Sequence, residues 1–150
     1  MSINPALEGR SYPAGEAYVV SREKIREFAA ATKASHRSHY DQEAAAGLGH
    51  ADLVAPPTFA IIVAQRADAQ LIGDPESGID FSRVVHADQR FTLHRPIVAG
   101  DELVAELHVD KVRAMGGGAM ITTRSEISTT DGAAVATTIS SILVRGEEAA

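Results

Sequence analysis

The sequence predicts an α+β fold in which a mostly antiparallel sheet wraps around one long helix, and two observations carry this prediction. Residues 58–72 are apolar almost all round for their first two turns, so a helix there has to be enclosed by the rest of the protein. From residue 81 onward the chain changes to strand-like segments rich in Val, Ile and Thr. One buried helix followed by four or five long strands is typical of a sheet whose concave face buries the helix.

Length and composition bound the kind of protein. The chain has 150 residues, of which 45% are hydrophobic and 23% charged, so we expect one globular domain spanning residues 1–150. Its net charge of −6 argues against a nucleic-acid binder. Cysteine is absent, which excludes disulfides and thiolate chemistry. No secretory pattern and no stretch of about 20 apolar residues is present, so we expect a cytoplasmic protein with no membrane partner.

Two shorter helices are expected before the long one. Residues 17–20 read as a short strand, and Ser21 then stands where a helix N-cap would accept a hydrogen bond. Ile25 and Ala29 follow at helical spacing and give a helix with one buried stripe. Residues 41–48 predict a second, alanine-rich helix that ends at a glycine.

The long helix and the strands after it have clear boundaries. Pro57 suits the first turn of the helix, where a missing N–H costs nothing, and Gly73-Asp74-Pro75 stops it. Strands are expected at residues 82–86, 89–93, 102–112, 119–128 and 134–144. The breaks between them include a glycine run at 116–118 and a hairpin turn at Thr130-Asp131-Gly132.

A segment ahead of the long helix resembles a known active site. The MaoC-like (R)-specific enoyl-thioester hydratases and dehydratases have the fingerprint Gly-Asp-x-Asn-Pro-x-His, followed by a Gly/Pro-rich entry into a buried helix. On this chain the fingerprint's Gly, Asp, Asn and Pro fall on Lys33, Ala34, His36 and Arg37, and only its histidine is present, as His39. The signatures Gln-x-Phe at 89–91, Arg-Pro at 95–96 and Gly-Asp-x-Leu at 100–103 extend the resemblance over nearly the whole chain.

The resemblance implies a single hot-dog fold and a particular role. Elimination of water next to a thioester carbonyl needs groups that move protons, and Ala34 offers only a methyl group. The chain is most similar to the non-catalytic A-type subunits of two-subunit (3R)-hydroxyacyl-carrier-protein dehydratases, in which the partner carries the intact Asp/His dyad. The family also implies edge-to-edge pairing as a homodimer or heterodimer, an acyl-CoA or acyl-carrier-protein ligand, and no cofactor.

The resemblance also suggests which residues meet the ligand. It places the acyl thioester in a tunnel at the subunit interface, with the carbonyl facing the N-terminus of the long helix, where the amides of Thr58 and Phe59 are candidate donors. His86, Asp88 and Gln89 would face the tunnel or the partner, with bracing of the structure favoured for Asp88 and Gln89.

His39 is the one fingerprint residue that could take part directly in catalysis, because an unperturbed imidazole, with a pKa of about 6.5, can exchange protons near neutral pH. Asp41 or Asp88 could assist it in place of the missing carboxylate. The grouping of His36, His39 and Asp41 fits no specific metal motif, so no metal is expected.

Three functions therefore remain open. The first is a non-catalytic, acyl-binding subunit of a heteromeric (3R)-hydroxyacyl-thioester dehydratase. The second is a stand-alone homodimer that binds acyl thioesters without converting them. The third is a weak homodimeric enoyl-thioester hydratase that uses His39. Only the third predicts activity of the isolated chain towards crotonyl-CoA, and only the first predicts an active complex with a MaoC-like partner.

Overall fold

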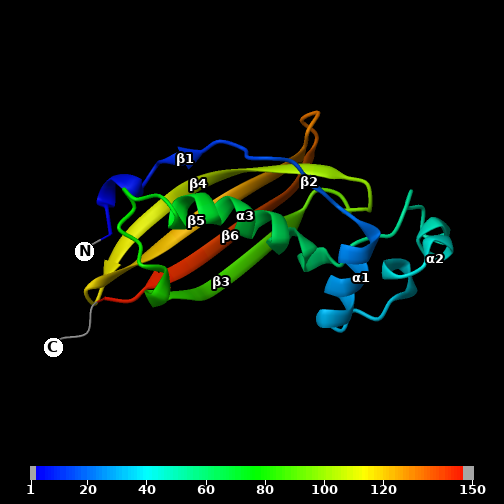
Figure 1. Cartoon of the computed structure of the whole chain (residues 1–150), viewed down its shortest axis with the longest axis horizontal. Helices are drawn as coiled ribbons and strands as arrows, with labels where there is room; N and C mark the ends of the chain where they lie inside the picture. The colour runs from blue at the N-terminus through cyan, green and yellow to red at the C-terminus, as the bar shows by residue number, and fades with distance from the viewer. Residues whose placement is uncertain (1–2, 147–150) are drawn as a thin grey trace.

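The computed structural model describes residues 3–146, which contain three α-helices and one sheet (Figure 1). The helices are α1 (Arg22–Ala31), α2 (Gln42–Gly47) and α3 (Ala60–Ile72). The strands are β1 (Ser11–Tyr12), β2 (Tyr18–Val19), β3 (Val84–Leu93), β4 (Glu102–Met115), β5 (Gly118–Thr129) and β6 (Ala134–Val144). Within these residues, no helix has the length and apolar character needed to cross a bilayer.

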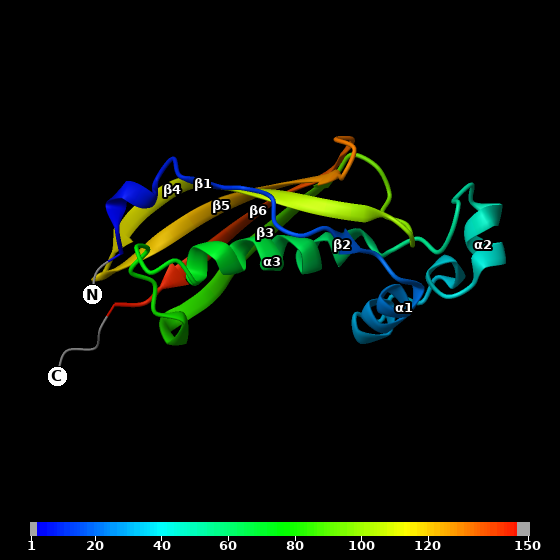
Figure 2. The same ribbon diagram turned by 45° about the horizontal axis from the view of Figure 1, so that its top comes forward.

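The strands form a six-stranded antiparallel sheet around α3. The order is β1-β4-β5-β6-β3, and β2 also pairs with β4, so β1 and β2 share one edge while β3 forms the other. Both views of the ribbon show α3 lying along one face of the sheet, with α1 and α2 beyond one end of it (Figures 1 and 2). The prediction of an α+β fold with a long helix wrapped by an antiparallel sheet is confirmed.

Alternation along the long strands explains how the sheet covers the helix. Successive residues of a strand point to opposite faces, and in β4 the buried residues Leu103, Ala105, Leu107 and Val109 occur at every second position. They pack in one core with Val63 of α3 and other residues on the same side of that helix. The long helix is therefore enclosed, as its apolar sequence requires.

The helix boundaries follow the local signals closely. The Ser21 side chain accepts a hydrogen bond from the Lys24 amide, which confirms it as the N-cap of α1. The regular helix α3 begins at Ala60, two residues later than expected, because Pro57–Phe59 forms a 3₁₀ turn. The phenyl ring of Phe59 is fully buried, with its centroid 5.4 Å from that of Phe28. This turn fixes the start of α3 against α1.

The strands differ from the prediction in three places, of which the simplest is that β4 runs three residues beyond the expected 112, to Met115. Residues 82–86 and 89–93 were expected to form separate strands, whereas β3 is continuous and contains a bulge between His86 and Asp88. Ser82 and Arg83 precede it in a 3₁₀ turn. The short strand β1 was not expected, since two residues carry no alternation and its formation depends on pairing with β4.

Candidate functional site

The segment that resembles the hydratase fingerprint folds into a 3₁₀ turn, Arg37–His39, between α1 and α2 along the chain. His36 caps this turn, because its Nδ1 accepts a hydrogen bond from the Ser38 amide at 3.2 Å. The imidazole of His39 borders a pocket of about 440 Å³. The pocket is lined by His39, His50, Val54, Ala55, Pro57, Leu93, His94, Arg95 and Pro96.

The orientation of His39 is fixed by one hydrogen bond. Its Nδ1 lies 2.7 Å from the carbonyl oxygen of Val54. A carbonyl oxygen only accepts, so Nδ1 carries the hydrogen and Nε2 is the basic atom of the neutral ring. The ring is therefore held like a general base.

Within residues 3–146, no carboxylate lines the pocket beside this imidazole. The residues that line the pocket include three histidines and Arg95 but no acid. Ala34, at the position that resembles the family's aspartate, lies after α1, and its carbonyl oxygen accepts a hydrogen bond from the Tyr40 hydroxyl at 2.8 Å. Its side chain is a methyl group. The pocket thus contains an oriented imidazole without the carboxylate that accompanies it in the fingerprint.

Neither of the two acids considered as substitutes is placed to help His39. The Asp41 carboxylate caps α2 by accepting from the Glu43 amide, and it pairs with Arg37 at 3.1 Å. Asp88 lies on β3, where it pairs with Arg90 at 3.3 Å, and it lines a different pocket from His39. The candidate dyad of His39 with either acid is therefore not assembled.

The two amides at the start of α3 differ in their availability. The Phe59 amide donates to the carbonyl oxygen of Pro56 at 2.9 Å, and its ring belongs to the core, so Phe59 has no free donor to offer. Thr58 is exposed at the first turn. Of the two residues, Thr58 alone remains a candidate to meet a ligand.

The bulge in β3 separates the three polar residues that the sequence grouped together. Gln89 is paired directly with the buried Ser140 of β6, and directly opposed residues in an antiparallel pair share one face. His86 joins them, with its Nε2 3.0 Å from Gln89 Oε1 and 3.1 Å from Ser140 Oγ. Asp88 pairs with Ser141, on the opposite face of the sheet. Only His86 and Gln89 therefore face α3.

Sequence reasoning missed Asp68, the one acid of α3 and a partly buried residue. Its Oδ1 accepts a hydrogen bond from the Thr123 hydroxyl of β5 at 3.3 Å. Burial raises the pKa of the Asp68 carboxyl from 3.8 to about 6, while the Thr123 hydroxyl and the nearby His86 oppose this rise. The sequence did contain one sign of Asp68: it is a single acid between Ala67 and Ala69 in a helix predicted to be enclosed.

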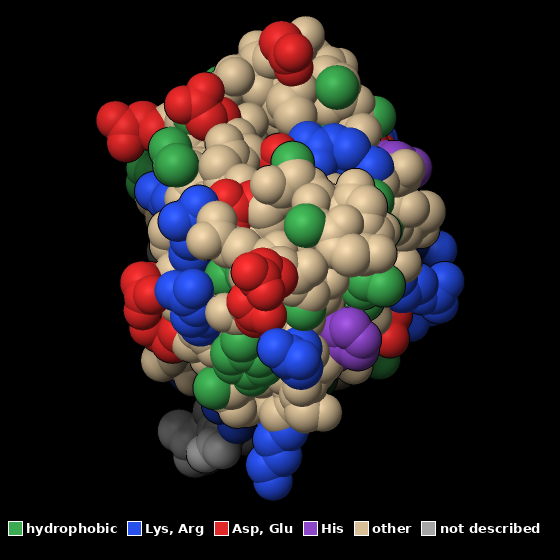
Figure 3. Space-filling model, turned by 90° about the vertical axis from the view of Figure 1, so that its right-hand side faces the viewer, with side chains coloured by type: hydrophobic (Ala, Val, Ile, Leu, Met, Phe, Trp, Pro, Cys, Tyr) green, Lys and Arg blue, Asp and Glu red, His purple; other side chains and the backbone are tan. Residues whose placement is uncertain are grey.

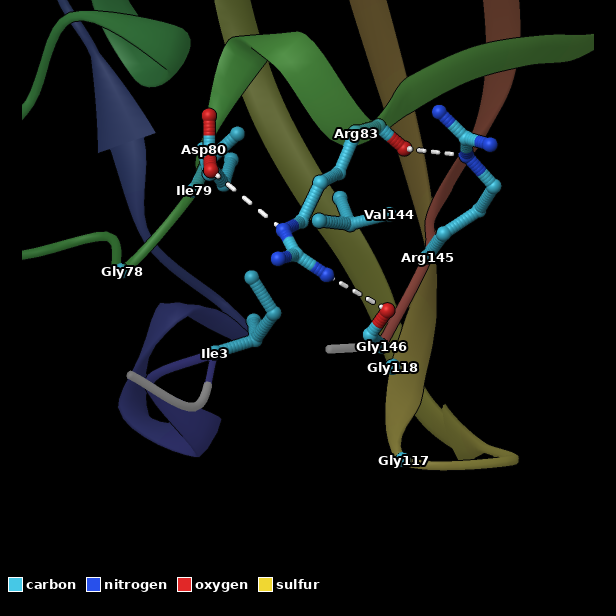
Figure 4. A pocket seen from close by; sticks show the side chains of 10 residues that line it. All are labelled: Ile3, Gly78, Ile79, Asp80, Arg83, Gly117, Gly118, Val144, Arg145 and Gly146. Atoms are coloured by element: carbon cyan, nitrogen blue, oxygen red, sulfur yellow. Dashed lines mark hydrogen bonds and ion pairs between the residues drawn. The ribbon is translucent and has the colours of Figure 1, made fainter. Parts of the chain in front are cut away.

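Another pocket, of about 510 Å³, lies at the far end of the sheet near the hairpin between β4 and β5 (Figure 4). Arg83 projects into it, with its Nη1 2.7 Å from the Gly146 carbonyl oxygen and its Nε 3.4 Å from Asp80. The Gly146 carbonyl oxygen and the Asp80 carboxylate thus already bind the guanidinium group of Arg83. Among residues 3–146, its lining includes no histidine, serine, threonine or lysine, so these residues offer no imidazole like that of His39.

The charged surface shows no preference for one sign at the end where α1 and α2 lie. Acidic and basic side chains are interspersed there, with histidine among them (Figure 3). Across residues 3–146, no three His, Cys, Asp or Glu side chains gather closely enough to hold a metal ion.

Comparison with solved structures defines the class of fold. The chain superposes on a chain of the C-terminally truncated HadBC (3R-hydroxyacyl-ACP dehydratase) complex from Mycobacterium tuberculosis with a TM-score of 0.83 and 34% identity, covering 91% of this chain and 96% of that one. It also matches a MaoC-like dehydratase with a TM-score of 0.85 and 33% identity, spanning 94% of this chain and 43% of that longer chain. The protein therefore has the hot-dog fold of the MaoC-like dehydratases.

The family follows from the sequence comparison. Residues 6–138 match the family model described as "FAS1-like, dehydratase domain region", and the chain belongs to this family. Its relatives include a UPF0336 protein from Clavibacter michiganensis subsp. michiganensis, 51% identical over 99% of this chain and 100% of that protein. A second, from Leifsonia xyli subsp. xyli, is 54% identical over 97% of this chain and 98% of its own length. The resemblance to MaoC-like dehydratases inferred from the motifs is thus confirmed.

Proposed function

We propose that this protein is the non-catalytic, acyl-binding subunit of a (3R)-hydroxyacyl-thioester dehydratase and works with a MaoC-like subunit that carries an intact Asp/His dyad. The observation that carries the proposal is the pocket around His39, which has a well-oriented imidazole and, among residues 3–146, no carboxylate in its lining. Elimination needs one group to take the α-proton and another to protonate the leaving hydroxyl. The partner subunit would supply both groups.

The free edge of the sheet supports pairing with such a partner. β3 pairs with β6 on one side and has no strand on its other side within the part of the chain that the structure describes. A ten-residue edge strand leaves backbone donors and acceptors that another strand can satisfy. Val85 and Phe81, at and just before the start of this strand, are 44% and 70% exposed, so apolar side chains are available to a partner at this end of β3. The similar HadBC chain comes from a (3R-hydroxyacyl-ACP dehydratase) complex.

The N-terminal end of α3 is the part of this chain at which we expect the thioester group to bind. The helix N-terminus carries partial positive charge, and Thr58 is exposed there beside the pocket-lining Pro57. His39 and His94 border the same space, so an acyl thioester of CoA or of a carrier protein would meet hydrogen-bonding groups at its polar end. The apolar acyl chain would gain about 0.8 kcal/mol for each methylene it buries.

The proposal is tested by reconstitution with a MaoC-like protein that has the complete fingerprint. The two chains are co-expressed, the complex is isolated, and hydration of crotonyl-CoA and of longer enoyl-CoAs is measured. We expect activity that is lost when the partner's Asp or His is replaced and retained in the His39→Ala variant of this chain. The reverse pattern, with His39 essential and the partner's dyad dispensable, would contradict the proposal.

The same experiment separates the stand-alone alternatives. A chain that forms only homodimers, binds acyl-CoA and never co-purifies with a MaoC-like partner would be an acyl-binding homodimer. A homodimer that hydrates crotonyl-CoA through His39 would be a weak hydratase. The positions of Asp41 and Asp88, each engaged by an arginine away from His39, favour neither acid as its helper.

A further inference from the structure

The concave face of the sheet carries a band of hydrogen-bonding side chains in its middle. The buried hydroxyls of Thr123 and Ser140, 3% and 5% exposed, are cross-strand neighbours on β5 and β6. Two further buried hydroxyl residues, Ser125 and Thr138, form the next pair along the same strands. Such positions in a core are ordinarily occupied by aliphatic side chains, since burying a hydroxyl costs free energy unless it is used.

Apolar residues flank these hydroxyls on both sides. Towards one end of the sheet, Ile121 of β5 is paired with Ile142 of β6. Towards the other end, Ile127 is paired with Ala136. The polar residues therefore interrupt an otherwise apolar face over two successive pairs in the middle of the sheet, so the polarity is local rather than a property of the whole interior.

The polar groups lie between α3 and the free edge strand. We define the polar band as Asp68, Thr123, Ser140, His86 and Gln89. Thr123 donates to Asp68 at 3.3 Å, Ser140 Oγ lies 3.1 Å from His86 Nε2, and that nitrogen lies 3.0 Å from Gln89 Oε1. These two groups of hydrogen bonds are neighbours on the sheet, because Thr123 and Ser140 are directly opposed across β5 and β6.

Two atoms of the polar band are available for a further hydrogen bond. The amide oxygen of Gln89 only accepts, so Nε2 of His86 carries a hydrogen and Nδ1 is the basic nitrogen of the neutral ring. Within residues 3–146, neither His86 Nδ1 nor Asp68 Oδ2 has a hydrogen-bond partner. His86 is exposed and Asp68 is partly buried, so the band is open to solvent at its edge.

We propose that the polar band is a binding site for an uncharged oxygen substituent, a hydroxyl or keto group, on the acyl chain. A hydroxyl would donate to Asp68 or to His86 Nδ1, and a protonated Asp68 would donate to a keto oxygen. The flanking isoleucines would contact the methylene groups on either side of that substituent. This inference rests on the proposed function, and it adds the class of acyl chain that the subunit selects.

The test compares ligands that differ only in this oxygen. Decanoyl-CoA and its mid-chain and terminal hydroxy derivatives are titrated calorimetrically into the isolated chain and into the complex with a MaoC-like subunit. We expect at least one hydroxylated ligand to bind about 3- to 10-fold more tightly than decanoyl-CoA, the net effect of one hydrogen bond. The Asp68→Leu and His86→Leu variants should lose this preference, whereas Gln65→Leu, an exposed position on the same helix, should keep it.

The outcomes distinguish this inference from the proposed function. Equal affinities for all ligands, or a preference that both variants retain, would overturn the binding site while leaving the subunit role untouched. Variants that weaken partner binding without changing ligand preference would show that the band serves the subunit contact, which also overturns it. Turnover by the complex tests the proposed function separately, because ligand preference is measured at equilibrium.

Discussion

Replacing Asp68 by asparagine is expected to stabilise the isolated chain at neutral pH. Burial raises the pKa of this carboxyl from 3.8 to about 6, so the folded protein favours the neutral acid. At 1.36 kcal/mol for each pH unit, that difference corresponds to at most about 3 kcal/mol. Asp68 is partly open to solvent, so we expect a gain of about 2 kcal/mol for Asp68→Asn at pH 8. Asparagine keeps an oxygen that can accept from Thr123.

The sign of the pH dependence makes the prediction specific. The stability associated with a protonated Asp68 is fully present below pH 3.8 and is lost as the pH rises through about 6. Urea unfolding of both proteins between pH 4 and pH 8, a range of about four units, should therefore give a difference that grows with pH. A difference that is independent of pH, or a variant less stable than the parent at pH 8, would refute the reasoning about this carboxyl.

Two further predictions concern the loop before β4 and the edge strand. The Asp101 carboxylate accepts hydrogen bonds from the Arg95 guanidinium at 3.0 and 3.1 Å. Asp101→Asn should therefore lower the free energy of unfolding by about 1–3 kcal/mol, measured by thermal unfolding. An unchanged unfolding midpoint would show that this ion pair is too solvated to stabilise the fold. Val85→Lys places a charge on the exposed part of β3 and should weaken partner binding in size-exclusion chromatography, whereas Met115→Lys, at the 41% exposed hairpin end, should not. Equal complex formation by both lysine variants would exclude β3 as the pairing edge.

The regular elements were predictable because their signals are local. Ser21 marks the start of α1, and the apolar run and Pro57 mark α3, since capping and periodicity depend on neighbours in the sequence. The bulge in β3 was not predictable from these rules. It depends on how β3 registers against β6, and this register decides that His86 and Gln89 face α3 while Asp88 faces away.

The candidate site was predictable only in part. The motif spacing placed His39 beside the start of the long helix and identified Ala34 as the missing acid. It could not reveal that the Phe59 amide is occupied by the Pro56 carbonyl, because that bond belongs to a 3₁₀ turn. Nor could it reveal the polar band, whose members come from α3, β3, β5 and β6 and meet only in the folded sheet.

The most direct test of the account is turnover by the isolated chain. Among residues 3–146, the pocket at His39 lacks the carboxylate of the dyad, so purified protein should leave crotonyl-CoA unhydrated at any enzyme concentration. Hydration is measured as a loss of the absorbance of the enoyl thioester. Addition of a MaoC-like subunit with an intact dyad should then start the reaction. Sustained hydration by the isolated chain that disappears in His39→Ala would contradict the account.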